Sequence, residues 1–357
     1  MTQTGPRAAA FPSALLPWAS RVERRIDDLL GRELERWRAV DDTLAQPLGA
    51  LREFVATGGK RLRPAFCYSA FVGAGGDPDD TSVVDAAAAL ELVHTFALVH
   101  DDVMDGSDTR RGRDAVHRRF AAVHTEEGRR GEARRFGEGM AILIGDFAVV
   151  YADLLMRDAS IVARDVYDEL RIELCVGQVL DLEGTASATI DTGFANRIAV
   201  YKSGKYTVER PLHLGAALAG RLADLAPVLS DIGLPLGHAF QLRDDVLGAF
   251  GDDAVTGKPV GDDLREGKPT PLAALAHSRA CGEDRARMAR LGSPDLTPDE
   301  VRDLRDIFVK TGALEEVEAD ISRLVARARD ALAAAPLVEP ARTWLDELAG
   351  YVAWRDR

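Results

Sequence analysis

The spacing of apolar residues along this chain is helical almost throughout. Apolar positions recur every three or four residues, and the strong helix formers Ala, Leu, Arg and Glu dominate. Alternating runs of Val, Ile and Thr, which are typical of half-buried strands, are absent from the sequence. The periodicity predicts helices over 19–40, 44–56, 79–105, 137–157, 161–183, 205–220, 225–250, 300–310 and 312–334. We therefore expect an all-α protein.

Segments rich in glycine and proline divide these helices and predict the loops. The clearest are 73–78, 251–267 and 294–298. Residues 124–137, rich in Arg, Glu and Gly, are typical of a solvated loop. No repeat or linker divides the chain, so we expect one domain over 19–357. Residues 1–18 lack the long apolar stretch of a signal peptide and are expected to form a loose N-terminal tail.

Composition narrows the class of protein. With 357 residues and 46% hydrophobic content, the chain can bury a sizeable core. A formal net charge of -13 argues against nonspecific binding to nucleic acid or an anionic membrane. The cysteines Cys67, Cys175 and Cys281 are too far apart for a CxxC or zinc pattern, which favours a reducing, cytoplasmic compartment. No apolar run approaches the roughly 18–20 residues of a membrane span.

Two acidic clusters follow mostly apolar helices. The first is Asp-Asp-Val-Met-Asp at 101–105, just before Gly106, and the second is Asp244-Asp245. Asp101 and Asp105 are four positions apart and share a helix face. The helix dipole disfavours carboxylates at a C-terminal end, and burying them without a partner is costly. A bound cation would resolve both problems, and oxygen ligands without soft neighbours favour Mg²⁺ or Mn²⁺.

Basic residues surround both acidic clusters. They are Lys60, Arg61 and Arg63 in the glycine turn 58–64, Arg110, Arg111 and Arg113 after the first cluster, and Lys202, Lys205, Lys258 and Lys268 around the second. Arginine grips phosphate oxygens in pairs, and lysine supplies a mobile point charge. Simple ion pairing of Arg110 and Arg111 with Asp105 and Asp108 is the alternative. The combination of acids and cations favours a metal-bridged phosphate.

These motifs occur together in a characteristic order. They are Gly-Gly-Lys-Arg-Leu-Arg-Pro at 58–64, Leu-Val-His-Asp-Asp-Val-Met-Asp at 98–105, Arg-Arg-Gly at 110–112, Lys-Ser-Gly-Lys at 202–205 and Phe-Gln-Leu-Arg-Asp-Asp at 240–245. The set resembles the trans-isoprenyl diphosphate synthases of the polyprenyl synthetase family, and most of all the bacterial geranylgeranyl diphosphate synthases. The resemblance extends over about residues 20–355. It implies a single large helical bundle around a deep central active-site cavity, usually in a homodimer.

The resemblance also implies an activity and a role for each matching residue. The reaction is the head-to-tail condensation of an allylic diphosphate with isopentenyl diphosphate, and the departing diphosphate takes the final proton. About two or three Mg²⁺ per site, replaceable by Mn²⁺, would be held by Asp101, Asp102, Asp105, Asp244 and Asp245. The allylic diphosphate would contact Arg110, Lys202 and Lys258, and isopentenyl diphosphate would contact Lys60, Arg63, His94 and Arg111. The catalytic group would be Lys202, Ser203 and Gln241, with oxygens of the last two facing the developing cation. Lys268 would close over the site with its loop.

The second acidic cluster departs from the family pattern. Gly248 stands where the family usually has a third aspartate. Asp252 and Asp253 follow within two turns, but the glycines at 248 and 251 leave their placement open. Some bacterial members with this Asp-Asp-x-x-Gly form carry a later Gly-Asp-Asp-Leu-Arg-Glu-Gly-Lys stretch, here residues 261–268. The departure weakens the metal assignment at 248 and leaves the implied activity intact.

Product length and the competing functions complete the sequence analysis. In the family, product length depends on residues just before the first cluster, here the bulky Phe96 and the small Ala97, which imply a C20 product. Phe96 as an ordinary core residue is the alternative, as are farnesyl or longer products. A class I terpene cyclase would carry an Asn/Asp-Ser-Glu triad and would not need Lys60 and Arg63. A noncatalytic synthase subunit would usually lose an acidic cluster, and Gly248 is the one hint of that.

Overall fold

The computed structural model describes residues 9–187, 191–251, 261–293 and 295–355, which are almost entirely helical. The long elements are α1 (Leu16–Arg38), α2 (Ala45–Ala56), α3 (Leu62–Gly73), α4 (Thr81–Asp105), α5 (Val116–Glu126), α6 (Ala133–Met156), α7 (Ile161–Ala186), a π-helix (Ala199–Glu209), α9 (Arg210–Leu218), α10 (Leu222–Phe250), α15 (Pro298–Lys310), α16 (Ala313–Ala334) and α17 (Ala341–Trp354). Shorter pieces are α8 (Thr192–Ile198), α12 (Asp262–Glu266), α13 (Pro271–Arg279), α14 (Gly282–Met288) and 3-10 turns at Ser13–Leu15 and Asp42–Leu44. Two strands, β1 (Thr109–Arg110) and β2 (Arg113–Asp114), pair in a hairpin. The expected all-α class is confirmed.

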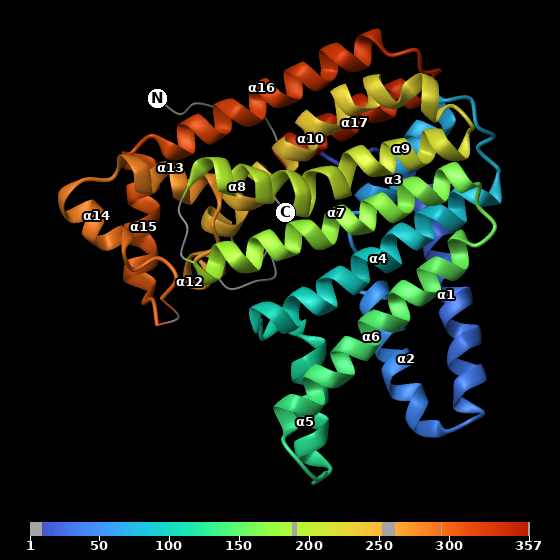
Figure 1. The fold of residues 1–357 in the computed structure, drawn as a ribbon, viewed down its shortest axis with the longest axis horizontal. Coiled ribbons are helices and arrows are strands. Elements are labelled where there is room, and N and C mark those ends of the chain that lie inside the picture. The colour runs from blue at the N-terminus through green and yellow to red at the C-terminus, as the bar shows by residue number, and fades with distance from the viewer. Residues whose placement is uncertain (1–8, 188–190, 252–260, 294, 356–357) are drawn as a thin grey trace.

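The helices form one bundle. Figure 1 shows α16, α10, α7 and α4 running across the body in roughly the same direction, with α5, α6, α1 and α2 extending below them. The fully buried helix α3 packs against α9, α4 and α17 and forms the centre of the core. The π-helix packs between α7 and α10. Helices from both halves of the sequence therefore surround one interior.

Several helices were not predicted. The missing elements are α3, α5, α8, α12, α13, α14 and α17. Every residue of α3 is buried, so the segment has no polar face and no amphipathic period to detect. The predicted solvated loop over 124–137 is too long at both ends. Helix α5 continues to Glu126, and helix α6 already begins at Ala133.

The N-terminal tail is shorter than expected. Helix α1 begins at Leu16, and the buried side chains of Leu15 and Trp18 extend its apolar stripe. Trp18 stacks on Tyr68 with ring centroids 4.3 Å apart. The expectation of a loose tail is therefore wrong for residues 13–18, because this segment buries apolar surface. Residues 1–8 lie outside the described residues.

Two helices have the length and hydropathy of a membrane span, contrary to the sequence expectation. They are α4 and α6. In α4, 67% of the most apolar window is buried inside the protein, which is the environment of a core helix. In α6 the buried share is 44%, so much of its apolar surface faces outward.

Candidate active site

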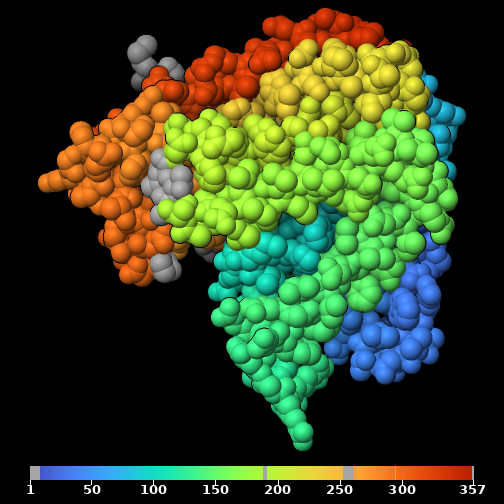
Figure 2. All heavy atoms as spheres, viewed as in Figure 1, coloured from blue at the N-terminus to red at the C-terminus, as the bar shows by residue number. Residues whose placement is uncertain are grey.

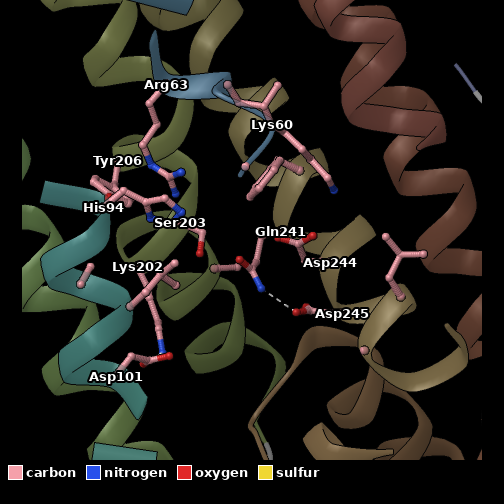
Figure 3. A pocket seen from close by; sticks show the side chains of 18 of the residues that line it. Lys60, Arg63, His94, Asp101, Lys202, Ser203, Tyr206, Gln241, Asp244 and Asp245 are labelled. Carbon is pink, nitrogen blue, oxygen red and sulfur yellow. Dashed lines mark hydrogen bonds and ion pairs between the residues drawn. The ribbon is translucent and has the colours of Figure 1, made fainter. Parts of the chain in front are cut away.

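A cavity of about 1070 Å³ lies among α4, α7, the π-helix, α10 and the glycine turn before α3. Its wall includes most of the residues predicted from the sequence: Lys60, Arg63, His94, Ala97, Asp101, Arg110, Arg111, Lys202, Ser203, Gln241, Asp244, Asp245 and Lys268. Figure 3 shows Asp101 and Lys202 on one side, Asp244 and Asp245 on the opposite side, and Lys60 and Arg63 at one end. Residues that are far apart in sequence thus meet around one space.

The first acidic cluster gains a member that the sequence analysis missed. Ligand atoms of Asp101, Asp105 and Asp181 all lie within 4.8 Å of one another. Asp181 comes from α7, together with Gln178, whose amide nitrogen donates to Asp101 Oδ1 at 3.0 Å. Gln178 and Asp181 are spaced i, i+3 on an otherwise apolar stretch, which was the signal available in the sequence. Three carboxylates at this spacing are hard oxygen donors suited to Mg²⁺ or Mn²⁺.

Two lysines lie among these carboxylates. Lys202 Nζ lies 3.0 Å from Asp101 Oδ1 and 2.5 Å from Asp181 Oδ2. Lys268 Nζ lies 3.1 Å from Asp105 Oδ2 and 2.8 Å from Glu266 Oε2. Burial opposes the charge on Asp101, but Lys202, Lys268 and Arg110 outweigh it and lower its pKa. Asp101 is therefore ionised and can bind a cation.

Asp102 does not lie where the metal assignment requires. It is almost fully buried, is not part of the cavity wall, and accepts a hydrogen bond of 2.8 Å from Arg110 Nε. Successive helix residues point about 100° apart, so Asp102 cannot share the face of Asp101 and Asp105. Its position makes it the partner that holds Arg110 at the cavity. The alternative from the sequence was that Arg110 pairs with Asp105 or Asp108. The structure instead pairs Arg110 with Asp102.

Close backbone contacts place Lys202 and Ser203. A Cβ on Gly177 of α7 would fall within 3.0 Å of the Lys202 backbone, and a Cβ on Gly237 of α10 would do the same against Gly204. Glycine at these positions lets the π-helix approach both neighbours. A π-helix shifts the side-chain register within a helical segment and is frequent at functional sites. The sequence prediction of an α-helix over 205–220 missed this element.

Cations gather at the other end of the cavity. Arg63 donates to Thr207 Oγ1 at 2.8 Å, and its guanidinium lies 4.2 Å from the ring centroid of Tyr206. Arg111 sits in a two-residue turn with φ 54°, followed by Gly112 with φ 72°, as in a type I′ hairpin. Burial and the neighbouring arginines lower the pKa of Arg111, and burial with the same arginines lowers the pKa of His94. An anion would relieve this crowding of positive charge.

The second acidic pair lies on α10. Asp245 is buried and accepts a hydrogen bond of 2.6 Å from Gln241 Nε2 (Figure 3). This bond uses one N–H of the Gln241 amide and leaves its oxygen as the acceptor for a ligand. Asp244 pairs with Arg355 near the C-terminus. Burial raises the pKa of Asp245 well above its usual range, and the nearby carboxylates of Asp263, Asp244 and Asp181 add to the effect.

Of the predicted residues that the structure describes, Asp102, Asp105 and Phe96 do not line the cavity, and Asp105 reaches the first cluster from beside it. Phe96 is partly buried and packs edge-on against His100, with ring centroids 4.6 Å apart, while its neighbour Ala97 lines the cavity. His100 in turn contacts the Ile142 carbonyl of α6, so Phe96 lies on the α6 side of α4. Lys258, Asp252 and Asp253 lie outside the described residues.

Comparisons with known proteins agree with the site. The family model described as polyprenyl synthetase matches residues 46–308. A crystal structure of geranylgeranyl pyrophosphate synthase from Corynebacterium glutamicum, complexed with isoprenyl diphosphate and magnesium, is 37% identical with a TM-score of 0.85, covering 94% of this chain and 99% of that one. Geranylfarnesyl diphosphate synthase of Aeropyrum pernix is 32% identical over 86% of this chain and 93% of its own. Nonaprenyl diphosphate synthase of Mycobacterium tuberculosis is 30% identical over 97% of this chain and 95% of its own length.

These similarities extend over nearly the whole length of each protein, and they agree with the motifs that line the cavity. The chain therefore belongs to the polyprenyl synthetase family and is a trans-prenyltransferase.

Proposed function

We propose that this prenyltransferase condenses an allylic diphosphate with isopentenyl diphosphate head-to-tail in a Mg²⁺-dependent reaction, and that its main product is C20 geranylgeranyl diphosphate. The observation that carries the proposal is a cavity whose wall holds Asp101 and Asp181, which cluster with Asp105, together with the cations Lys60, Arg63 and Arg111. Two anionic substrates thus have separate binding regions within one space.

The acidic walls are the proposed site of the allylic diphosphate. Asp101, Asp105 and Asp181 would hold Mg²⁺, or Mn²⁺ in its place, with Asp244 and Asp245 opposite. The bound metal would stabilise the charge that develops on the departing diphosphate. Lys202 and Arg110 stand beside these carboxylates and would contact the diphosphate oxygens directly.

The cationic end is the proposed site of isopentenyl diphosphate. Lys60, Arg63 and Arg111 would bind its diphosphate, and His94 would remain neutral there because its pKa is lowered. Between the two sites, Ser203 Oγ and the amide oxygen of Gln241 would face the allylic cation. Apolar residues of the wall, including Leu98, Leu174 and Ile198, would keep water away from that cation.

Product length is proposed from Ala97. A small side chain on the cavity wall leaves room for a growing chain, which supports C20 over shorter products. The named relatives differ in this respect, since they are geranylgeranyl, geranylfarnesyl and nonaprenyl diphosphate synthases. Farnesyl and longer products are therefore the alternatives that the assay must separate.

A homodimer and a cytoplasmic location are part of the proposal. Exposed apolar side chains lie along α6 and α7, whose surfaces are visible in Figure 2: Ile142, Leu143, Val150, Leu154, Ile172, Val176 and Val179. A second copy of the chain would cover this surface, as the family resemblance implies. The free cysteines Cys67, Cys175 and Cys281 fit a reducing compartment.

One assay tests the proposed function. Purified protein is incubated with Mg²⁺, isopentenyl diphosphate and a C5, C10 or C15 allylic primer, and the products are separated by chain length. We expect elongation that stops mainly at C20. No elongation with any primer would refute the activity and leave a noncatalytic subunit, whereas a cyclic hydrocarbon would identify a terpene cyclase.

A further inference from the structure

The carboxylate of Asp263 lies directly against Gly248. A Cβ built on Gly248 would lie within 3.0 Å of Asp263 Oδ2 and 2.8 Å from Asp263 Cγ. Both residues line the cavity together with Asp244 and Asp245. Gly248 is one helical turn beyond Asp244 on α10, so the Asp263 carboxylate occupies the space into which a side chain at 248 would project.

Local structure fixes Asp263 in this place. Asp263 belongs to α12, which follows Gly261 in the left-handed region with φ 79°. The Asp263 carbonyl accepts a hydrogen bond of 3.1 Å from the Lys268 backbone nitrogen. The next residue, Leu264, is buried and its carbonyl accepts from Gly292 at 2.9 Å. The carboxylate is thus presented by an anchored turn.

Asp263 shares one described cation, Lys268, with other carboxylates, and the nearby Asp245 is buried. The Asp245 side chain is 5% exposed, and its Oδ2 has no hydrogen-bond partner among the residues that the structure describes. Lys268 Nζ lies 3.9 Å from Asp263 Oδ1, farther than from Asp105 and Glu266. A buried, unpartnered carboxylate oxygen facing further carboxylates is costly unless a cation completes the group.

We propose that Asp263 supplies the third carboxylate of the second metal-binding group, beside Asp244 and Asp245, and that glycine at 248 keeps the space that this carboxylate fills. The proposal rests on the proposed function, because the metal would bind there together with a diphosphate. It also accounts for the departure at 248, since the missing acid is delivered by α12 instead of α10. The acid that the motif lacks at position 248 would thus come from α12.

Metal binding without turnover tests the proposal. Mn²⁺ is titrated into the full chain with inorganic diphosphate, and free Mn²⁺ is followed by electron paramagnetic resonance. We expect Asp263→Asn to weaken Mn²⁺ binding roughly 10- to 100-fold, the range found when groups supporting a metal site are removed. Asp306→Asn, an exposed carboxylate on α15, is the control and should leave binding unchanged. Unchanged binding by Asp263→Asn would overturn the proposal.

A transfer of the carboxylate tests the spatial equivalence of the two positions. Gly248→Asp alone should weaken Mn²⁺ binding, because its side chain collides with Asp263 and adds a like charge. Gly248→Asp combined with Asp263→Gly should recover most of the lost affinity. A double variant that is folded by circular dichroism and still binds Mn²⁺ as weakly as Asp263→Asn contradicts the proposal.

The outcomes separate this inference from the proposed function. If the wild type binds Mn²⁺ with diphosphate but elongates no primer, the activity is refuted while the variants still decide the role of Asp263. If the wild type elongates its primer and Asp263→Asn binds Mn²⁺ normally, the activity stands and the role of Asp263 is rejected.

Discussion

Arg61 and Glu91 form a buried ion pair beneath the glycine turn that carries Lys60 and Arg63. Arg61 also donates to the Val55 carbonyl at 2.9 Å, and its backbone has φ 48°, which is uncommon for a residue other than glycine. The side-chain contacts hold this backbone conformation, since a strained residue persists only where its surroundings fix it. The ion pair therefore fixes the turn that places Lys60 and Arg63 at the cationic end of the cavity.

We expect Glu91→Gln to raise the KM for isopentenyl diphosphate more than it lowers kcat, because Lys60 and Arg63 lose their fixed turn. The free energy of unfolding should fall by about 3 kcal/mol, as when one partner of a buried pair is removed. Steady-state kinetics and urea unfolding measure both. Glu23→Gln is the control: it removes the half-exposed partner of Arg61 at 3.3 Å and should change little. Equal effects of the two variants would argue against the positioning role.

Asp181→Asn should lower kcat roughly 10- to 100-fold and raise the Mg²⁺ concentration needed for half-maximal rate, because it removes a carboxylate from the group with Asp101 and Asp105. The change also removes a charge partner of Lys202. Rates measured across a Mg²⁺ series are the readout. Asp165→Asn, exposed on the same helix, should behave as the wild type. Wild-type Mg²⁺ dependence in Asp181→Asn would exclude Asp181 from the metal site.

Gly177→Ala should reduce activity strongly, because its Cβ collides with the backbone of Lys202 and pushes the π-helix away from α7. We expect a cost of about 1–3 kcal/mol in the free energy of unfolding, as for overpacked cores. Gly139→Ala on α6 is a matched change in open space and should stabilise by about 0.5–1 kcal/mol. Thermal melts and product assays on both variants check this. If Gly177→Ala kept wild-type activity and melting temperature, the close approach of Gly177 to the Lys202 backbone would not be required.

His94 should make stability depend on pH below its ordinary pKa of 6.5. Burial and the arginines lower the pKa of folded His94, so the unfolded chain binds a proton that the folded chain does not. Stability is therefore present above pH 6.5 and is lost as pH falls towards the folded pKa, by up to about 1.4 kcal/mol per pH unit. Urea unfolding at several pH values should show a shallower loss in His94→Gln. The wild type and His94→Gln share the other histidines. If their unfolding free energies fell with pH at the same rate, His94 would not be a buried neutral group.

Ala97→Phe should shorten the main product by about one isoprene unit, because an aromatic ring fills part of the cavity wall. Chromatography of the products after complete turnover gives the chain length. Phe96→Ala, which the family resemblance predicts to lengthen the product, tests the α6 side of α4 in parallel. An unchanged product from Ala97→Phe would move the length limit away from this wall.

Much of the fold and the site could be predicted from the sequence. Apolar periodicity located α1, α2, α4, α6, α7, α10, α15 and α16. Most of them bury one face and expose the other, whereas α4 is buried on nearly all sides in its first half. The acidic clusters stood out because carboxylates are disfavoured near a helix C-terminus: the first ends α4, and the second lies in the last two turns of α10. The turn at Lys60 and Arg63 stood out because it brings cations to the start of α3. Helix α3 was not predicted, because a fully buried helix has no alternation of apolar and polar residues to detect.

The sequence by itself determined which residues carry charge and on which helix most of them lie, since helix formation and side-chain spacing are local. Only the tertiary structure decided which side chains meet. Packing of α7 against α4 brought Asp181 to Asp101 and Asp105, and rotation along α4 turned Asp102 towards Arg110 and Phe96 towards α6. It also set Asp263 against Gly248. Such contacts depend on how helices distant in sequence approach each other, and the period of a single helix does not contain that information.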